Sequence, residues 1–175
     1  MKYALGSTIL ILVLVVAGYF AYPYLMNHGS SHADAIKGEE TFLLHMIPHH
    51  QEAIDTSKIV LASTQDEILR RLTSNIISAQ EGEISIMEGT LISKYPEAQP
   101  IIYKAMMDTN LANYTGEELE KAYLEGMILH HEGAIAMAEK MKNHEMEAST
   151  QVIVTNIIAT QQAEIDEMKL LLQNY

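Results

Sequence analysis

Histidine and methionine recur in this sequence at spacings that place them on one face of a helix. The pattern Met-x-x-His occurs three times, as Met46/His49, Met127/His130 and Met141/His144. Residues three positions apart are neighbours on a helix surface, so each pair presents a thioether beside an imidazole. A thioether with an imidazole favours copper, particularly Cu(I), and Cu(II) also accepts imidazole and carboxylate ligands. The pattern therefore predicts a copper site, with iron and zinc as weaker candidates.

Two of these pairs belong to a segment that occurs twice in the chain. Residues 42–57 read FLLHMIPHHQEAIDTS and residues 123–138 read YLEGMILHHEGAIAMA, with seven identities in sixteen positions. Residues 75–87 (NIISAQEGEISIM) and 156–168 (NIIATQQAEIDEM) share seven of thirteen. The two copies are nearly unrelated between these windows, which indicates that the matching stretches share a task. The alternative is that both are simply helix-packing faces.

The matching stretches carry polar side chains on faces that their helical period makes core-facing. Six residues have this placement: His50, His131, Gln80, Glu83, Gln161 and Glu164. Burying such groups without partners costs a few kcal/mol each. They must therefore satisfy one another, line water or bind a ligand. A hydrogen-bonded polar layer that fixes helix register is the alternative to a metal site.

The two copies differ in how many soft thioether ligands and how many imidazole ligands they offer a metal. His45 and His49 are four residues apart and suit a bidentate clip, whereas the second copy has Gly126 in place of His45. Thr56 stands where the second copy has Met137. Because thioethers favour Cu(I) and imidazoles favour Cu(II), we expect the second copy to hold Cu(I) more tightly and the first to prefer Cu(II).

Further residues extend the pattern with weaker support. Met137, Met141 and His144 continue along the third predicted helix, although methionine is also a common filler of apolar cores. His28 and His32 precede the helices, where we expect solvated linker residues or an auxiliary low-affinity site.

The elements that position these residues are predicted to be helices. Low Pro, Gly and aromatic content favours an all-α chain, and helical periodicity marks residues 38–63, 65–94, 116–143 and 147–173. Capping-box signals at Thr64/Glu67 and Thr115/Glu118 mark two helix starts. Pro48 falls inside the first helix and should kink it or remove one backbone bond. A crossover joins the second and third helices, and the pattern allows one short helix within it, over residues 97–110. Two duplicated hairpins related by pseudo-twofold symmetry then pack as an antiparallel four-helix bundle.

The N-terminal residues 1–26 predict a membrane anchor or an export signal, followed by a linker (27–37) and the helical domain (38–175). Leu5–Met26 is almost wholly apolar and follows Lys2. About 20 apolar residues span a bilayer as a helix. As a secretory signal, the segment would be cleaved after Ala35, and the domain would be secreted. The apolar run is long for a signal core, so we favour the anchor. Either way the domain lies outside the cytoplasm, on the periplasmic or extracellular face.

Composition excludes several partners and chemistries. A net charge of −12 argues against nucleic acid, whose phosphates need a basic footprint. The absence of cysteine excludes disulfides, thiolate metal sites and a cysteine nucleophile.

The motifs HMIPHHQEAI and GMILHHEGAIAMA, with two Q-x-x-E-I-x-x-M segments, resemble the bacterial family called domain of unknown function 305 (DUF305), over residues 38–173. The resemblance implies a ferritin-like helical bundle, and some members are implicated in periplasmic copper binding and resistance. It also implies metal ligands from Met46, His49, His50, Met127, His130 and His131, faced by Gln80, Glu83, Met87, Gln161, Glu164 and Met168.

Three functions are compatible with these features. The favoured one is an exported, membrane-tethered copper-binding protein for buffering, transfer or resistance, with a copper-handling protein or a second copy as its partner. The second is a ferritin-like metal oxidase, which needs more inward carboxylates than one Glu per hairpin. The third is a non-metal helical scaffold or adaptor for a membrane partner.

Overall fold

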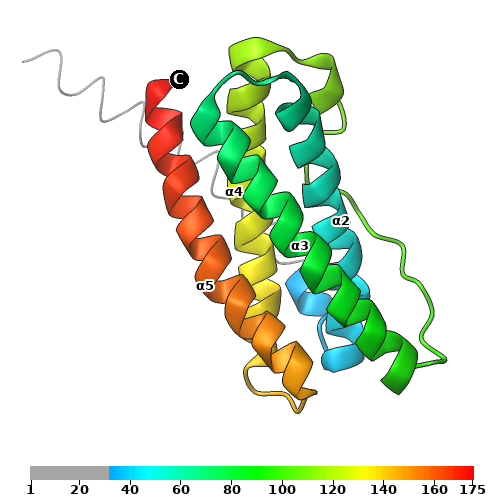
Figure 1. Ribbon diagram of the computed structural model, residues 1–175. Coiled ribbons are helices and arrows are strands. Elements are labelled where there is room, and N and C mark those ends of the chain that lie inside the picture. Colours follow the sequence, from blue (N-terminus) through cyan, green and yellow to red (C-terminus); the bar gives the residue numbers. More distant parts are fainter. Residues whose placement is uncertain (1–31) are drawn as a thin grey trace, which may run out of the picture.

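Four long helices form an antiparallel bundle in the computed structural model, which describes residues 32–175 (Figure 1). The helices are α2 (Glu39–Ser63), α3 (Glu67–Lys94), α4 (Gly116–Met141) and α5 (Ala148–Leu171). In Figure 1, α2 and α5 run upward and α3 and α4 run downward, so every pair of neighbouring helices is antiparallel. The predicted all-α four-helix architecture is confirmed.

The hydrophobic segment Leu5–Met26 lies outside the described residues. None of the helices within residues 32–175 is long and apolar enough to span a bilayer.

The helix ends differ in detail from the predicted capping boxes. Asp66, not Thr64, caps α3, because its carboxylate accepts the backbone N–H groups of Ile68 (2.7 Å) and Leu69 (3.0 Å). Thr64 instead ends α2, and no side chain caps the start of α4 at Thr115. The helix α2 continues through Pro48, whose missing N–H removes one backbone bond.

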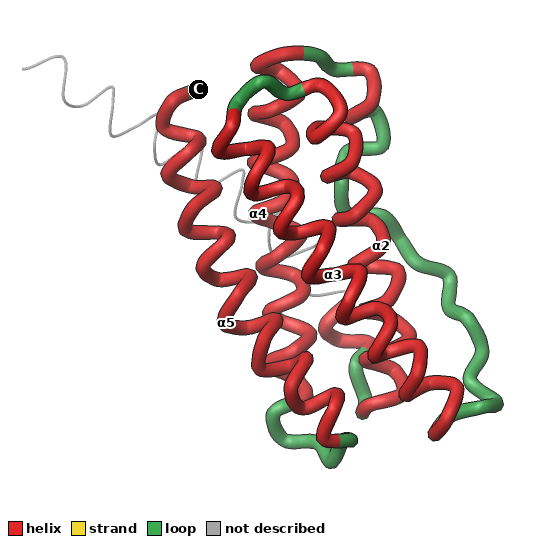
Figure 2. The backbone as a smooth tube through the Cα atoms, viewed as in Figure 1, coloured by secondary structure: helices red, strands yellow, loops and turns green. Residues whose placement is uncertain are grey.

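The crossover from α3 to α4 is extended and runs along the side of α2 (Figure 2). The short helix that the sequence allowed over 97–110 does not form. One 3₁₀ turn, Leu111–Asn113, precedes α4. The backbone of this segment bonds to a side chain instead. Glu52 accepts the N–H groups of Met106 and Met107 (both 2.9 Å) and the hydroxyl of Tyr103 (2.7 Å). We call residues 103–107 the strap.

The apolar core consists of two clusters, one in each half of the bundle. The upper cluster, as seen in Figure 1, includes Val60, Leu72, Tyr123, Met168 and Leu171, and the lower cluster includes Phe42, Met87, Ala134, Met141 and Ile153. Each cluster therefore draws on all four helices. Buried polar side chains from the four helices occupy the middle of the bundle: His49, His50, Gln80, His130, His131 and Gln161.

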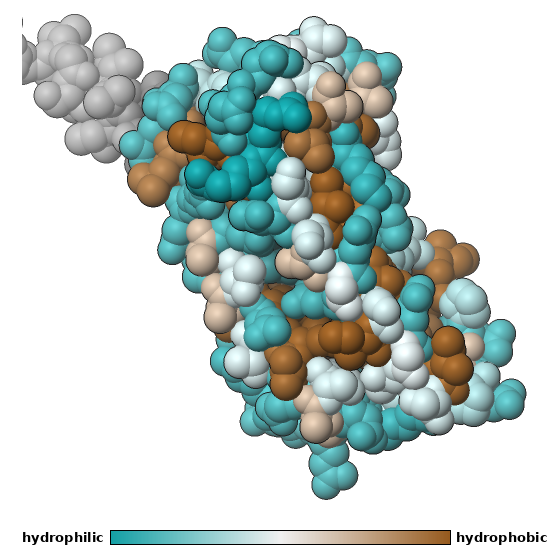
Figure 3. Space-filling view, in the orientation of Figure 1, coloured by the Kyte–Doolittle hydropathy of each residue, from teal (hydrophilic) through white to brown (hydrophobic). Residues whose placement is uncertain are grey.

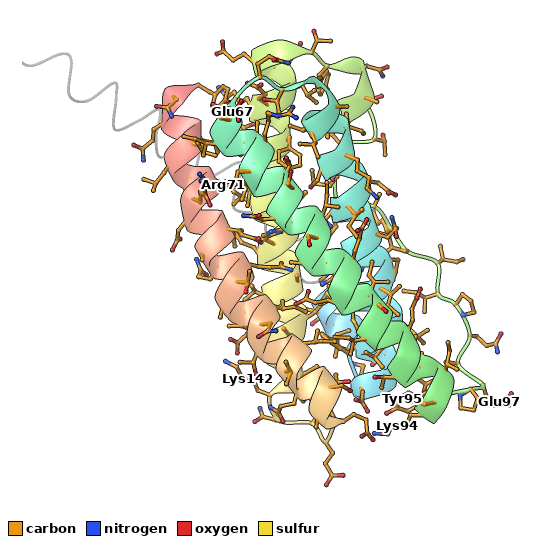
Figure 4. All side chains as sticks on the ribbon, in the orientation of Figure 1. Glu67, Arg71, Lys94, Tyr95, Glu97 and Lys142 are labelled. Carbon is orange, nitrogen blue, oxygen red and sulfur yellow. The ribbon has the colours of Figure 1, made fainter. Side chains whose placement is uncertain are left out.

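A buried carboxylate joins three helices at the lower end of the bundle. Glu39, 3% exposed, accepts bonds from Lys94 Nζ (2.7 Å), the Tyr95 hydroxyl (2.8 Å) and the backbone N–H of Glu147 (2.8 Å). Figure 4 shows Lys94 and Tyr95 at the end of α3 opposite Glu67. Burial alone would raise the pKa of Glu39, but these bonds, the one from Lys94 foremost, outweigh it and lower the pKa to about 2.

Glu39→Gln is expected to weaken the dependence of stability on acid pH. A carboxyl whose pKa falls from 4.5 to about 2 on folding stabilises the protein above pH 4.5, and this stability is lost as the pH falls toward 2. The contribution at neutral pH is on the order of 3 kcal/mol. Urea unfolding at a series of pH values should show a flatter acid limb for Glu39→Gln. Glu81→Gln, in an exposed pair with Lys58, is the control and should keep the wild-type slope. Equal slopes in all three proteins would contradict the prediction.

Candidate metal centre

His49 and His130 meet at the centre of the bundle. Because α2 and α4 are antiparallel neighbours, these corresponding residues of the two sequence copies face each other across the interface. Their ring centroids are 3.7 Å apart with a 36° interplanar angle, and both side chains are buried. Three of the four ring nitrogens, both of His49 and Nδ1 of His130, have no polar partner, whereas His130 Nε2 lies 3.3 Å from Glu52 Oε2. Buried polar atoms are nearly always partnered, so three orphaned nitrogens at one place indicate a ligand site.

The electrostatics keep both rings neutral. Burial and then the neighbouring imidazoles, His130 first, hold the pKa of His49 well below 6.5. Burial also lowers the pKa of His130 to about 4, more than the nearby Glu52 raises it. A metal binds only unprotonated imidazole, so these rings are ready to bind metal at neutral pH without releasing a proton.

The adjacent histidines face two other helices. Successive residues of a helix point about 100° apart, so His50 turns toward α3 and His131 toward α5. His50 Nε2 donates to Glu83 Oε2 (2.7 Å), and His131 Nε2 donates to Glu164 Oε2 (2.8 Å). In both rings Nδ1 has no partner. A carboxylate that fixes one ring nitrogen as the donor leaves the other as a free lone pair, which is the usual support for a metal-binding histidine.

Four of the predicted polar residues line a groove between α3 and α5. The groove has a volume of about 320 Å³ and is lined by Gln80, Glu83, Gln161 and Glu164, among others. The Gln80 amide and the Gln161 oxygen are buried without partners. Figure 3 views this face of the bundle, where hydrophilic and hydrophobic side chains are interspersed. The groove leads from the surface to the carboxylates that hold His50 and His131.

The methionines lie on both sides of the histidine layer. Met46 and Met87 belong to the lower cluster and Met127 and Met168 to the upper cluster, and all four are fully buried. Met46 and Met127 each precede their histidine by one helical turn, so antiparallel packing places one thioether on either side of the His49/His130 pair.

Three predicted residues stand apart from this centre. Met137 and Met141 are seven and eleven residues beyond His130, about 10 and 16 Å along the helix, and pack in the lower cluster. His144 is exposed in the turn after α4. The structure brings residues of both copies into one layer, with His49 of the first copy against His130 of the second. The antiparallel packing puts Met137 and Met141 of the second copy in the same lower cluster as Met46 and Met87 of the first.

His32 was expected in a solvated linker, and the structure places it in the core instead. Its side chain is 6% exposed, stacks on Tyr103 with centroids 5.0 Å apart, and bonds through Nε2 to the Lys104 carbonyl (3.1 Å). The His45 ring lies 5.9 Å and the His49 ring 6.5 Å from it. A third imidazole therefore lies near His45 and His49, the two residues predicted to act as a clip.

The sequence-based prediction also missed Glu52. Its carboxylate lies 3.3 Å from His130 Nε2 as well as holding the strap. Burial would raise the pKa of Glu52, but the contacts with His130, Tyr103 and Met107 lower it to about 2. The available signal was that Glu52, like His45, stands where the second copy has glycine.

No three His, Asp or Glu side chains within residues 32–175 are already grouped closely enough to hold a metal ion. A site at the histidine layer therefore needs thioether ligands or a small rotation of side chains.

The comparisons with known proteins agree with this architecture. The family model "Domain of unknown function (DUF305)" matches residues 39–172. This chain belongs to the DUF305 family. A curated relative from Acanthamoeba polyphaga mimivirus, "Uncharacterized protein L153", is 42% identical over 91 residues, which is 52% of this chain and 57% of that protein.

Several solved structures are similar to this chain over about four fifths of its length. CopM in the Cu(I)-bound form has a TM-score of 0.72 at 32% identity, covering 79% of this chain and 98% of CopM. CopM in the Cu(II)-bound form has a TM-score of 0.71 at 30% identity, covering 78% and 97%. A DUF305 fragment from Deinococcus radiodurans has a TM-score of 0.70 at 26% identity, covering 81% and 99%. The recognition of the family from its motifs is confirmed.

His130 is expected to remain neutral at pH 5, because its pKa of about 4 lies below that pH. Long-range ¹⁵N–¹H NMR of the imidazole groups distinguishes a neutral ring from a cationic one, and His130→Gln assigns the signal. Free histidine in the same buffer, mostly cationic at this pH, is the reference. A cationic pattern for His130 at pH 5 would mean that the centre of the bundle is hydrated rather than dry.

Proposed function

We propose that this protein is an exported copper-binding protein that holds Cu(I) at the His49/His130 pair, between the thioethers of Met46 and Met127. The observation that carries the proposal is the close pair of buried imidazoles at the centre of the bundle, in which three of the four ring nitrogens have no polar partner. A bound ion satisfies lone pairs whose burial is otherwise costly.

The chemistry of the surrounding groups supports copper over harder ions. Two imidazoles with flanking thioethers form a soft ligand set, which suits Cu(I). The nearby carboxylates Glu83 and Glu164 already bond to His50 and His131, and they leave both Nδ1 atoms available to Cu(II). The likeness to CopM, solved in Cu(I)-, Cu(II)- and Ag-bound forms, supports the same ligand preference.

The remaining predicted residues have supporting roles in this proposal. Gln80 and Gln161 line the groove toward Glu83 and Glu164. Met87 and Met168 share the apolar clusters of Met46 and Met127. Met137, Met141 and His144 lie too far from His130 to bind the same ion.

The segment before the bundle supports export with an uncleaved anchor. Leu5–Met26 is long enough to span a bilayer. Cleavage after Ala35 would also remove His32 and Ala33, both buried against the bundle. An anchored domain on the outer side of the membrane fits copper buffering, or transfer to a copper-handling partner.

The non-metal scaffold is the alternative. It explains the packing of the helices, but it requires neither orphaned imidazoles nor carboxylates directed at histidines. An oxidase has less support, because the carboxylates at the histidine layer, Glu52, Glu83 and Glu164, already bond to the strap or to histidines.

Met46→Leu and Met127→Leu are expected to weaken Cu(I) binding by roughly tenfold or more, in line with the loss seen when metal-site residues are removed. Leucine keeps the volume and apolar character, so the fold should survive with a modest loss of stability. Competition with a chromophoric Cu(I) chelator measures the affinity of the full-length protein in detergent. Cu(II) affinity should stay near that of the wild type.

Met141→Leu is the matched control, because Met141 is equally buried but lies about 16 Å from the level of His130. It should bind Cu(I) like the wild type. If all three variants match the wild type, these methionines are core residues only. A wild-type protein that binds neither copper ion would favour the scaffold.

A further inference from the structure

The two central helices differ at two positions where α2 has a large polar side chain and α4 has glycine. His45 and Glu52 correspond to Gly126 and Gly133 in the aligned copies. A Cβ atom added at Gly133 would lie 2.9 Å from Met106 Cε and 3.3 Å from Met106 Sδ. One added at Gly126 would lie 3.2 Å from the same two atoms of Met107. The two strap methionines therefore fill the spaces that the glycines of α4 leave open.

Only one of these methionines is placed beside a histidine. The Cβ position at Gly133 lies 3.5 Å from His49 Nε2 as well as 3.3 Å from Met106 Sδ. That nitrogen is buried and has no hydrogen-bond partner. No histidine atom is among the near neighbours of the Gly126 position, where Met107 packs.

Exposure separates the two methionines further. Met107 is buried at 6% exposure and belongs to the upper cluster, whereas Met106 is half-buried and outside both clusters. Met106 thus combines partial exposure to solvent with a thioether close to the buried His49 ring.

The strap is held in a way that fixes this placement. Glu52 accepts the backbone N–H of Met106 through both carboxylate oxygens (2.9 and 3.1 Å) and that of Met107 (2.9 Å). The same carboxylate accepts the Tyr103 hydroxyl (2.7 Å), and Tyr103 stacks on His32. A side chain of α2, three residues beyond His49, therefore sets the position of Met106 relative to His49.

We propose that Met106 is a thioether ligand for a soft monovalent cation at Nε2 of His49, and that the strap is the side from which the ion reaches the buried histidine pair. This inference rests on the proposed function and adds a ligand from outside the four helices. An ion arriving from solvent contacts the half-buried thioether first and then the imidazole, without opening the bundle.

The first test uses full-length protein with ¹³C-labelled methionine methyl groups and Ag(I), a soft monovalent probe that does not change oxidation state. Met106→Leu and Met107→Leu each remove one methyl signal from the ¹³C–¹H spectrum and so assign it. On addition of Ag(I), the Met106 methyl signal of the wild type should shift strongly, and the Met107 signal should stay in place.

The second test compares Cu(I) affinities of matched variants by chelator competition. Met106→Leu should bind Cu(I) roughly tenfold or more weakly than Met107→Leu does. The Met107→Leu variant still has the Met106 thioether near His49. Gly133→Ala should behave like Met106→Leu, because its Cβ displaces the flexible end of Met106. Gly126→Ala is the control and should match the wild type. Alanine favours helix more than glycine does, so neither glycine variant should lose binding through unfolding.

The outcomes separate this inference from the proposal beneath it. A wild-type protein that binds neither Ag(I) nor Cu(I) overturns both. A wild type that binds these ions while the Met106 signal stays unshifted, and while Met106→Leu and Met107→Leu bind Cu(I) equally, overturns the role of Met106 alone.

Discussion

The burial of four imidazoles across the middle of an apolar four-helix core is the constraint on which the rest of this structure depends. Each ring brings two nitrogens away from water, and an unpartnered buried polar group is costly. Glu83 accepts a hydrogen bond from one nitrogen of His50, and Glu164 accepts one from a nitrogen of His131. Of the six remaining nitrogens of these rings, only His130 Nε2 has a polar neighbour, the Glu52 carboxylate at 3.3 Å. The structure thus keeps a polar layer whose lone pairs only water, rearrangement or an ion can satisfy, and the two apolar clusters must stabilise the fold despite it.

The antiparallel arrangement explains why the histidines come in doublets. One residue of each doublet faces the opposite central helix and the next faces an outer helix, so a His-His step serves two interfaces of the same bundle. The same geometry mixes the two sequence copies, since the N-terminal half of α2 lies beside the C-terminal half of α4. The ligand types of a half-bundle are therefore not those of one copy. This is why comparison of the copies grouped Met137 and Met141 with His130, whereas the structure packs them in one cluster with Met46 and Met87.

The four helices and the polar layer could be predicted from the sequence because both follow from local periodicity. The contact of His50 with Glu83 pairs two positions already expected on facing stripes. The strap could not be predicted, because an extended segment has no period and its backbone bonds end on a side chain distant in the sequence, Glu52. The placement of His32 was hidden for the same reason, since its partner Tyr103 lies in that segment. Comparison of the copies treated Gly126 only as the loss of His45 and did not consider Gly133, whereas in the structure Met107 and Met106 occupy the spaces beside these two glycines.

The departures from twofold symmetry concentrate on one side of the histidine pair, and they have a common physical effect. Glu52 lies close to His130, binds the strap and carries a negative charge beside an otherwise neutral site. A cation entering on this side gains attraction from that carboxylate in a poorly solvated environment, where charges interact more strongly than in water. On the groove side, the carboxylates Glu83 and Glu164 are already bonded to imidazoles. A symmetric bundle would present two equivalent faces to an incoming ion. In this protein α4 has glycines where α2 has His45 and Glu52, and the strap is held by Glu52 of α2. The buried histidine pair therefore has one distinct outer side, with the partly exposed thioether of Met106 and the buried carboxylate of Glu52.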